Sequence, residues 1–382
     1  MDRRRFLAAG GATAVAPVLA SVGSASGATS GLFREVNFIH DGLGLTPREY
    51  AVLLQRMAAE RELTTDSYSN GGLIAELEAK MAALLGKQAA MFVPTGTLAN
   101  HLALRKLAGP DRRVLVQAES HVYADSGDGA EILSGLNLVP LAGGRSTITL
   151  DEVRHWVEAS RSGRVPMRIG AISIESPVRR RHHEMVDFAE VERVCRYARE
   201  QGIRLHLDGA RLFNLPYHSG RSVREHAALF DTVFVSLWKH FNAASGAILA
   251  GDAAFIEGLY HTRRMFGGSL PQAWPVAAIA LRYADGYEAD YARAWQAADR
   301  LISLLQGHPR IRVRKVPNGT SRFFLSVEGV PAERVVERAA KRGVLLPSWT
   351  TGVGELPMQV NPTLLRVRPE VLAQVLEDAA RG

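Results

Sequence analysis

Apolar runs of strand length alternate with stretches of helical periodicity through the middle of the chain. The apolar runs cover residues 89–93, 114–116, 136–141, 169–174, 203–207 and 232–236. Apolar residues recur at helical spacing between them, over 97–108, 149–160 and 187–201. Buried parallel strands are continuous apolar runs that are joined by helices. The alternation therefore predicts an α/β fold with a mainly parallel sheet flanked by helices.

The pattern changes on both sides of this region. A Gly-rich arm over 29–46 precedes Thr46-Pro47, a typical helix start, and a second helix is predicted from Leu73 to Leu85, ended by Gly86. After residue 270, a long helical stretch over 274–305 is followed by predicted strands over 311–313, 322–327 and 364–367 and helices over 331–342 and 370–381. We therefore predict a large domain over 29–270 and a smaller C-terminal α+β domain over 271–382.

The first 28 residues have the organisation of an export signal. Three arginines at positions 3–5 precede an apolar, Ala-rich stretch over 8–22, and small residues follow over 23–28. The paired arginines before Phe-Leu resemble a twin-arginine signal. We therefore predict a signal peptide over 1–28 and an exported, periplasmic or secreted protein. The alternative is a frayed amphipathic N-terminus on a cytoplasmic protein.

Composition narrows the class of partner. Apolar residues make up 47% and charged residues 22% of the 382 residues, as in globular proteins, which excludes a disordered, collagen-like or coiled-coil chain. The net charge of +7 is scattered along the sequence, which argues against a nucleic-acid-binding surface. After the leader, no apolar run reaches the length of a membrane span. We expect a small-molecule ligand, with neither nucleic acid nor membrane as partner.

Two predicted strand ends carry groups that suit a phosphorylated, planar ligand. Ligands of parallel sheets bind beyond the carboxyl ends of the strands. The run Pro94-Thr95-Gly96-Thr97 lies between a strand and a helix, where backbone N–H groups and a hydroxyl suit a phosphate. His121 follows the next strand, and its ring can stack on a planar cofactor or act as a base near neutral pH.

Two further strand ends carry an acid and an amine. Asp208 ends an apolar strand, and such a carboxylate needs a cationic partner, either Arg211 or a protonated ring nitrogen of a cofactor. Lys239 follows the next strand, where apolar surroundings lower the pKa of its amine and favour a Schiff base. A phosphate site, a stacking ring, a carboxylate and an amine are together complementary to one cofactor, pyridoxal 5′-phosphate.

With these residues the chain resembles a known family, the threonine aldolase and β-eliminating lyase group of fold-type I pyridoxal-phosphate enzymes. The resemblance covers nearly all of 65–382 and depends on the stretches 90–100, 206–214, 263–268 and 365–367, together with His121. It implies an aspartate aminotransferase-like fold. It also implies a homodimer or homotetramer whose active sites are shared between subunits.

The resemblance also implies a role for each matching residue. Lys239 bonds the cofactor aldehyde, Asp208 faces the pyridine nitrogen, and His121 stacks on the ring and is the candidate base, directly or through a water. Three further residues are expected to hold the cofactor: Gly96, Thr97 and Arg264. Arg211 is expected beside the cofactor or the substrate. Arg366 is expected to bind the substrate carboxylate, and Tyr68 to contact the substrate. Tyr68 alternatively packs under the following helix.

Several substrate-side stretches depart from the family pattern. The Gly-rich stretch after the lysine is replaced by 240–246, the Glu-Asn-Thr-His-Asn stretch by 175–179, and the N-terminal Ser-Asp-Thr-Val segment by 39–43. We expect a lyase that performs retro-aldol cleavage of a threonine-like β-hydroxy-α-amino acid to glycine or a small amino acid plus an aldehyde. The alternatives are β-elimination on an amino acid and an exported cofactor-binding protein without turnover. His182-His183 is expected to be a solvated loop and not a metal site.

Overall fold

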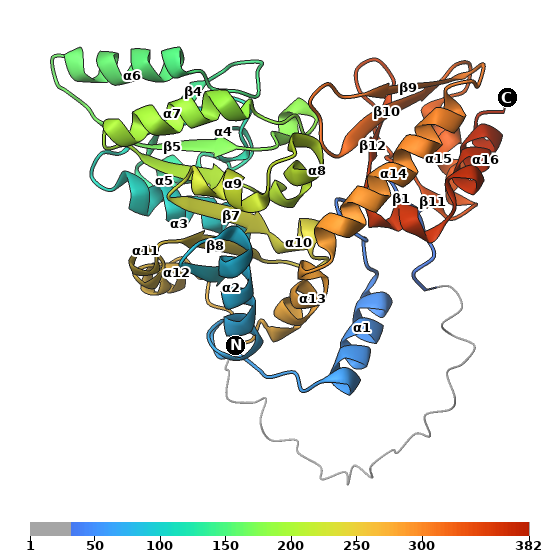
Figure 1. The fold of residues 1–382 in the computed structure, drawn as a ribbon, viewed down its shortest axis with the longest axis horizontal. Coiled ribbons are helices and arrows are strands. Elements are labelled where there is room, and N and C mark those ends of the chain that lie inside the picture. Colours follow the sequence, from blue (N-terminus) through green and yellow to red (C-terminus); the bar gives the residue numbers. More distant parts are fainter. Residues whose placement is uncertain (1–31, 382) are drawn as a thin grey trace, which may run out of the picture. The chain divides into compact units, whose positions relative to one another are not determined.

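The apolar runs in the middle of the chain form one sheet in the computed structural model, which describes residues 32–381. In this part of the chain the sheet has seven strands in the order β2-β8-β7-β6-β5-β3-β4 (Figure 1). The strands are β2 (Ala89–Val93), β3 (Arg113–Gln117), β4 (Asn137–Leu141), β5 (Ile169–Glu175), β6 (Arg204–Asp208), β7 (Thr232–Ser236) and β8 (Ala247–Gly251). Strand β8 runs antiparallel to β2 and β7, and the other pairs are parallel. The predicted α/β fold is confirmed.

Helices cover both faces of this sheet. Every residue of β5, β7 and β8 is buried, as expected for strands covered on both sides. The principal helices packed around it are α2 (Gly72–Leu85), α3 (Gly96–Ala108), α6 (Leu150–Ser162) and α7 (Phe188–Glu200). The prediction missed β8 (Ala-Ile-Leu-Ala-Gly), because three of its five residues are Ala or Gly, which are depleted in strands.

Both predicted N-terminal helix boundaries are confirmed. Helix α1 (Pro47–Glu60) begins after Thr46, whose hydroxyl accepts the N–H of Glu49 while the Glu49 carboxylate accepts the N–H of Thr46. This reciprocal capping satisfies two donors at the helix start. Helix α2 ends at Gly86, which has the left-handed conformation that favours glycine.

Shorter elements connect the larger ones. They are α4 (His121–Ala124), α5 (Gly129–Ser134), η1 (Arg179–Arg181), η2 (Leu212–Asn214), α8 (Leu215–Ser219), α9 (Val223–Ala228), α10 (Leu237–His240), α11 (Ala253–Glu257) and α12 (Tyr260–Met265). None of the described helices combines the length and apolarity needed to cross a bilayer.

The C-terminal part contains a second, smaller sheet. The long helical stretch is divided into α13 (Trp274–Ala284) and α14 (Tyr287–Leu305). An antiparallel sheet follows, with β10 (Arg322–Val327) between β9 (Ile311–Lys315) and β12 (Leu356–Gln359), accompanied by α15 (Ala332–Ala340) and α16 (Pro369–Ala379).

The predicted strand over 364–367 is wrong. Residues 364–366 belong to the 3₁₀ helix η3 (Pro362–Arg366), which Val367 follows, and the strand lies earlier, at β12. The side chain of Asn361 accepts the N–H of Thr363, and Pro362 occupies the first helical position. These two features start a helical turn where the apolar run alone indicated a strand.

The N-terminal arm contacts both parts of the chain. Strand β1 (Val36–Asn37) pairs with β11 (Val344–Leu345), and the side chain of Asn361 donates to the backbone carbonyls of Asn37 and His40 at 2.8 Å each. The backbone N–H of Leu43 donates to the side chain of Asn242 at 2.8 Å. From Phe33 onwards the described chain forms one compact unit, so the boundary at residue 270 stays a prediction. The predicted signal peptide over 1–28 lies outside the described residues.

The His182-His183 pair is only in part the solvated loop that we expected. His182 is exposed, but His183 is fully buried, and its Nδ1 lies 3.1 Å from the hydroxyl of Ser321. Backbone bridges from Glu184 to Val178 and Gly319 draw the turn against the small sheet. Within residues 32–381, no three His, Cys, Asp or Glu side chains group as metal ligands.

The close packing of β5 on the turn after α3 depends on a single glycine, Gly170. A Cβ atom at Gly170 would lie 2.1 Å from the carbonyl oxygen of Asp111 and 2.7 Å from that of Ala108. Because both obstacles are backbone, Gly170→Ala is expected to lower the free energy of unfolding by about 1–3 kcal/mol or more. Urea unfolding measures the change. Gly307→Ala, where a Cβ meets nothing within 4 Å, is the control, and equal stability of both variants would contradict the packing argument.

Candidate active site

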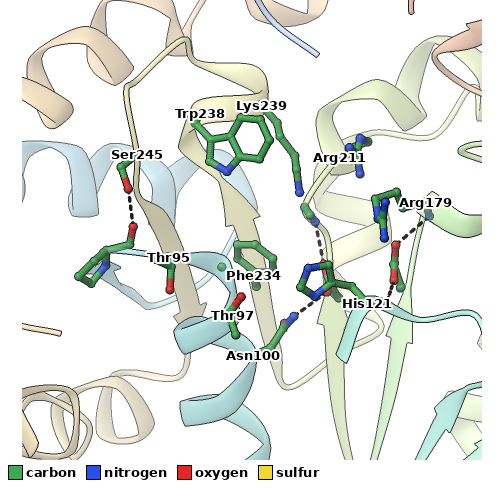
Figure 2. A pocket seen from close by; sticks show the side chains of 15 residues that line it. Thr95, Thr97, Asn100, His121, Arg179, Arg211, Phe234, Trp238, Lys239 and Ser245 are labelled. Carbon is green, nitrogen blue, oxygen red and sulfur yellow. Dashed lines mark hydrogen bonds between the residues drawn. The ribbon is translucent and has the colours of Figure 1, made fainter. Parts of the chain in front are cut away.

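A pocket lies beyond the carboxyl ends of the parallel strands, where the sequence predicts a ligand (Figure 2). It brings together residues that follow β2, β3, β6 and β7. Six of the predicted site residues line it: Gly96, Thr97, His121, Asp208, Arg211 and Lys239. The acid and the amine on which the cofactor hypothesis depends therefore face the same cavity.

Asp208 is fixed by a directional chain of hydrogen bonds. The side-chain amide of Asn100 donates to Asp208 Oδ2 at 2.6 Å, so its oxygen faces His206 Nε2, at 2.9 Å. His206 must then donate from Nε2 and accept at Nδ1 from the hydroxyl of Thr232, at 2.8 Å. Burial lowers the pKa of His206 to about 4, so its ring is neutral. The chain holds the Asp208 carboxylate in one orientation.

Lys239 supplies an amine that is available near neutral pH. It lies in the short helix α10, directly after β7. Burial, and then the positive charge of Arg211, lowers the pKa of Lys239 to about 8. The lysine Nζ lies 5.1 Å from the centroid of the Trp238 ring, which also lines the pocket. A less protonated amine is a better nucleophile toward an aldehyde.

The turn before α3 offers an anion site. Thr95 caps the helix by accepting the N–H of Leu98 with its hydroxyl. A Cβ at Gly96 would lie 2.2 Å from the Phe234 ring, so only glycine fits beside this pocket residue. Ser245 donates to the carbonyl of Pro94 at 2.7 Å and ties the turn to the segment after Lys239. Gly96 and Thr97, the first two residues of α3, line the pocket, and a helix start beside a cavity is typical of phosphate sites.

Glu175 positions the histidine. Its carboxylate accepts the backbone N–H of His121 at 2.6 Å and that of Arg179 at 2.8 Å. Burial, together with the charge of Asp208, raises the pKa of Glu175. Burial also lowers the pKa of His121 below its ordinary value. A neutral imidazole at this place suits both a stacking ring and a base.

Arg211 forms a buried ion pair with Asp41 of the N-terminal arm. Its Nε and an Nη lie 2.7 and 2.9 Å from the two carboxylate oxygens. Burial alone raises the pKa of Asp41, but the charge and hydrogen bonds of Arg211 outweigh it and hold the pKa below the ordinary value. Gln359 of the small sheet donates to the same carboxylate at 3.1 Å. Three segments far apart in sequence therefore meet beside the pocket.

Three predicted site residues do not line this pocket. Tyr68 is 49% exposed, and the guanidinium of Arg264 lies 5.2 Å from the centroid of its ring. Arg366 donates to the backbone carbonyl of Glu35 at 2.7 Å. The roles expected for these residues stay predictions.

The pocket also contains residues that the sequence did not single out. Asn100 and Glu175 lay within stretches that were compared with the family pattern, but nothing in the sequence indicated that their side chains line the pocket. Arg179 and Trp238 follow strands and line the pocket. Asp41 lay within a segment noted only for its departure from the family, and its pairing with Arg211 spans 170 residues. A distant pairing of this kind has no local signal.

Comparison with known proteins assigns the chain to a family. The sequence model described as beta-eliminating lyase matches residues 50–326. The chain belongs to the beta-eliminating lyase family. The expected resemblance is thus confirmed, and with it the identification as a pyridoxal-phosphate-dependent lyase.

Curated relatives and solved structures agree with the family. The chain is 31% identical to the low-specificity L-threonine aldolase of Candida albicans over 268 residues, covering 68% of this chain and 70% of that one. The match to the Saccharomyces cerevisiae enzyme, also 31% identical, covers 54% of this chain and about half of that one (53%). A putative L-allo-threonine aldolase from Listeria monocytogenes superimposes with a TM-score of 0.75 at 28% identity, covering 91% of this chain and 96% of that chain.

The residues present fit pyridoxal phosphate. The N-terminus of α3 offers N–H groups to a phosphate, and the absence of a side chain at Gly96 leaves the approach open. Asp208 and Lys239 offer the acid and the amine that the ring nitrogen and the aldehyde require. His121 lines the cavity with them.

The lowered pKa of Lys239 predicts that its amine reacts at a lower pH than the amine of an exposed lysine. In protein freed of cofactor, reductive methylation of Lys239 is expected to rise with an inflection near pH 8, because its buried amine loses its proton there. Peptide mass spectrometry across a pH series measures the labelling, with exposed Lys341 in the same digest as the internal reference. An inflection near the pH of about 10.4 typical of a free lysine would contradict the assignment.

Because Asp41 and Arg211 form a buried ion pair, the effects of substituting them on the free energy of unfolding are expected to be non-additive. Asp41→Asn keeps the shape of the side chain but leaves a buried arginine without its counter-charge, which costs about 3–5 kcal/mol. The double variant with Arg211→Met removes the stranded charge and is expected to be more stable than Asp41→Asn alone. Urea unfolding of the four proteins of the cycle measures this. A change within about 0.5 kcal/mol for Asp41→Asn, as at a surface site, would contradict the role of the pair.

Proposed function

We propose that the protein cleaves a threonine-like β-hydroxy-α-amino acid between Cα and Cβ, giving glycine or a small amino acid plus an aldehyde. The observation that carries this proposal is that Lys239, Asp208 and His121 line one cavity. When bound, pyridoxal phosphate withdraws the electrons that the broken bond leaves on Cα. The threonine aldolases among the relatives support the choice of this bond.

Each pocket residue has a task in this proposal. Lys239 would hold the cofactor through its aldehyde, and Asp208 would hold a proton on the pyridine nitrogen, aided by the fixed orientation that Asn100 gives its carboxylate. Gly96 and Thr97 hold the phosphate at the start of α3. Arg211, paired with Asp41, lines the cavity beside Lys239.

His121 is the proposed base. Cleavage needs a group that takes the proton of the β-hydroxyl, and a neutral imidazole in the cavity suits that step. Burial lowers the pKa of His121, so the ring is neutral at the pH at which the enzyme would act. Glu175 fixes the backbone of His121 and therefore the direction in which the ring leaves it.

β-Elimination is the second candidate, favoured by the description of the matching family. It uses the same cofactor residues but expels a leaving group from Cβ. The two reactions differ in their products, which are an amino acid plus an aldehyde in one case and a keto acid plus ammonia in the other.

Assembly and location are part of the proposal. We propose a homodimer or homotetramer with shared active sites, in which Tyr68 and Arg264, both outside the pocket of their own chain, contribute next to a second subunit. We also propose export through the twin-arginine-like segment over 1–28. Full-length protein confined to the cytosolic fraction, with its leader uncleaved, would contradict export.

Substitutions at Lys239 and His121 separate cofactor binding from chemistry. Lys239→Ala is expected to abolish turnover and the visible absorbance band of the bound cofactor. His121→Phe keeps a stacking ring but removes the base, so the band is expected to persist while kcat falls by about 10²–10⁴-fold.

Product analysis decides between the candidate functions. Wild-type protein incubated with β-hydroxy amino acids is expected to release an aldehyde and glycine in equal amounts. Release of keto acid and ammonia would establish β-elimination instead. A normal cofactor band without any product, across a panel of amino acids, would identify a binding protein without turnover.

A further inference from the structure

Arg322, at the start of β10, is a cation without an anionic partner near the pocket. It forms no ion pair with any residue among 32–381, although most arginines around it are paired. Its Nε donates to the side-chain oxygen of Gln359 at 3.2 Å, directly opposite in the antiparallel register. That oxygen carries no formal charge, and the Asp41 carboxylate, which also acts on Arg322, is already held by Arg211.

The neighbouring arginines are already engaged. Arg211 is held by both oxygens of Asp41. Arg179 pairs with Asp125, which also accepts two hydrogen bonds from Arg180. Neither Arg366 nor Arg322 lines the pocket itself, but Arg366 donates to the backbone carbonyl of Glu35, whereas Arg322 is joined by hydrogen bonds to residues beside the cavity. The two arginines that line the pocket therefore have carboxylate partners, whereas Arg322 has none within the described chain.

A continuous chain of hydrogen bonds connects Arg322 to the pocket. Arg322 donates to Gln359, Gln359 donates to Asp41, and Asp41 accepts from Arg211, which lines the cavity. Burial, then the like charge of Arg211, lowers the pKa of Arg322 to about 10, so the group stays protonated at neutral pH. Arg179 acts on it in the same direction. An anion bound here relieves the repulsion among these cations.

The place of Arg322 fits one anion in particular. Figure 2 shows Lys239 between Thr95 and Thr97 on one side and Arg179 and Arg211 on the other. The phosphate site therefore lies on the side of the lysine opposite to the arginines. An α-amino acid whose amine took the place of the Lys239 amine at the cofactor aldehyde would carry its carboxylate one carbon away from that amine, within reach of the arginine side.

We propose that Arg322 binds the α-carboxylate of the amino-acid substrate. This assignment rests on the proposed function and replaces Arg366, to which the family resemblance gives that contact. A guanidinium holds a carboxylate through two parallel hydrogen bonds. The Trp349 ring, with its centroid 5.7 Å from Arg322 Cζ, packs beside the guanidinium and favours one orientation of its plane.

The test compares two ligands that differ only at the carboxylate. Glycine and ethanolamine share the amine, and ethanolamine carries a hydroxymethyl group in place of the carboxylate. Each is titrated into cofactor-loaded enzyme, and binding is followed by the change in cofactor absorbance, which needs no turnover. The variants are Arg322→Gln, Arg322→Lys and Arg366→Gln. Arg314→Gln, in the neighbouring strand β9 and paired with Glu355 at 2.6 Å, is the matched control.

Wild-type enzyme is expected to bind glycine more tightly than ethanolamine. Arg322→Gln is expected to weaken glycine binding by about 10–100-fold, the value of a charge-assisted contact, and to leave ethanolamine binding unchanged. Arg322→Lys keeps the charge without the planar fork, so a smaller loss confined to glycine is expected. This variant decides the question if Arg322→Gln does not fold. Arg314→Gln is expected to behave as wild type.

Three outcomes would overturn the assignment. They are equal binding of glycine and ethanolamine by the wild type, a loss of glycine binding in Arg366→Gln but not in Arg322→Gln, and a loss of the cofactor itself from a folded Arg322 variant. The last would make Arg322 a cofactor residue. Absence of aldehyde from the wild type would instead overturn the lyase function, while the glycine titration would still decide the role of Arg322.

Discussion

The buried ion pair between Asp41 and Arg211 is the constraint on which the arrangement of the pocket depends. Two charges removed from water are tolerated only with close, well-oriented partners, and this pair meets that condition through two hydrogen bonds and a third from Gln359. The pair joins the N-terminal arm, the segment after β6 and the small sheet. The charges of Arg211 and Asp41 both act on Lys239, so the position of the arm and of the segment after β6 bears directly on the amine.

Burial then determines which groups in the pocket carry charge. It lowers the pKa of Lys239 and of His121, which favours a reactive amine and a neutral ring. Asp208 keeps a defined orientation because a neutral histidine behind Asn100 leaves the amide only one way to face. The same dry surroundings that activate the amine make an unpaired cation such as Arg322 costly, unless a ligand supplies the missing negative charge.

The sequence was informative where chemistry follows a strand directly. Asp208 and Lys239 come after apolar runs whose parallel pairing brings their ends to one edge, so their meeting could be predicted. The partnership of Asp41 with Arg211 could not, because it depends on how distant segments pack. Local rules also failed at residues 364–367, where Asn361 and Pro362 start a helical turn, and at β8, three of whose five residues are Ala or Gly.

The two sides of the pocket differ in how tightly the fold constrains them. The cofactor side is built from strand ends of one sheet, where a change at Gly96 meets the Phe234 ring at once. The proposed carboxylate contact comes from the small sheet, where Arg322 and Gln359 are directly opposite each other on antiparallel strands. Neither of these two residues lines the cavity that the strand ends form, so the small sheet can differ there without touching the cofactor side.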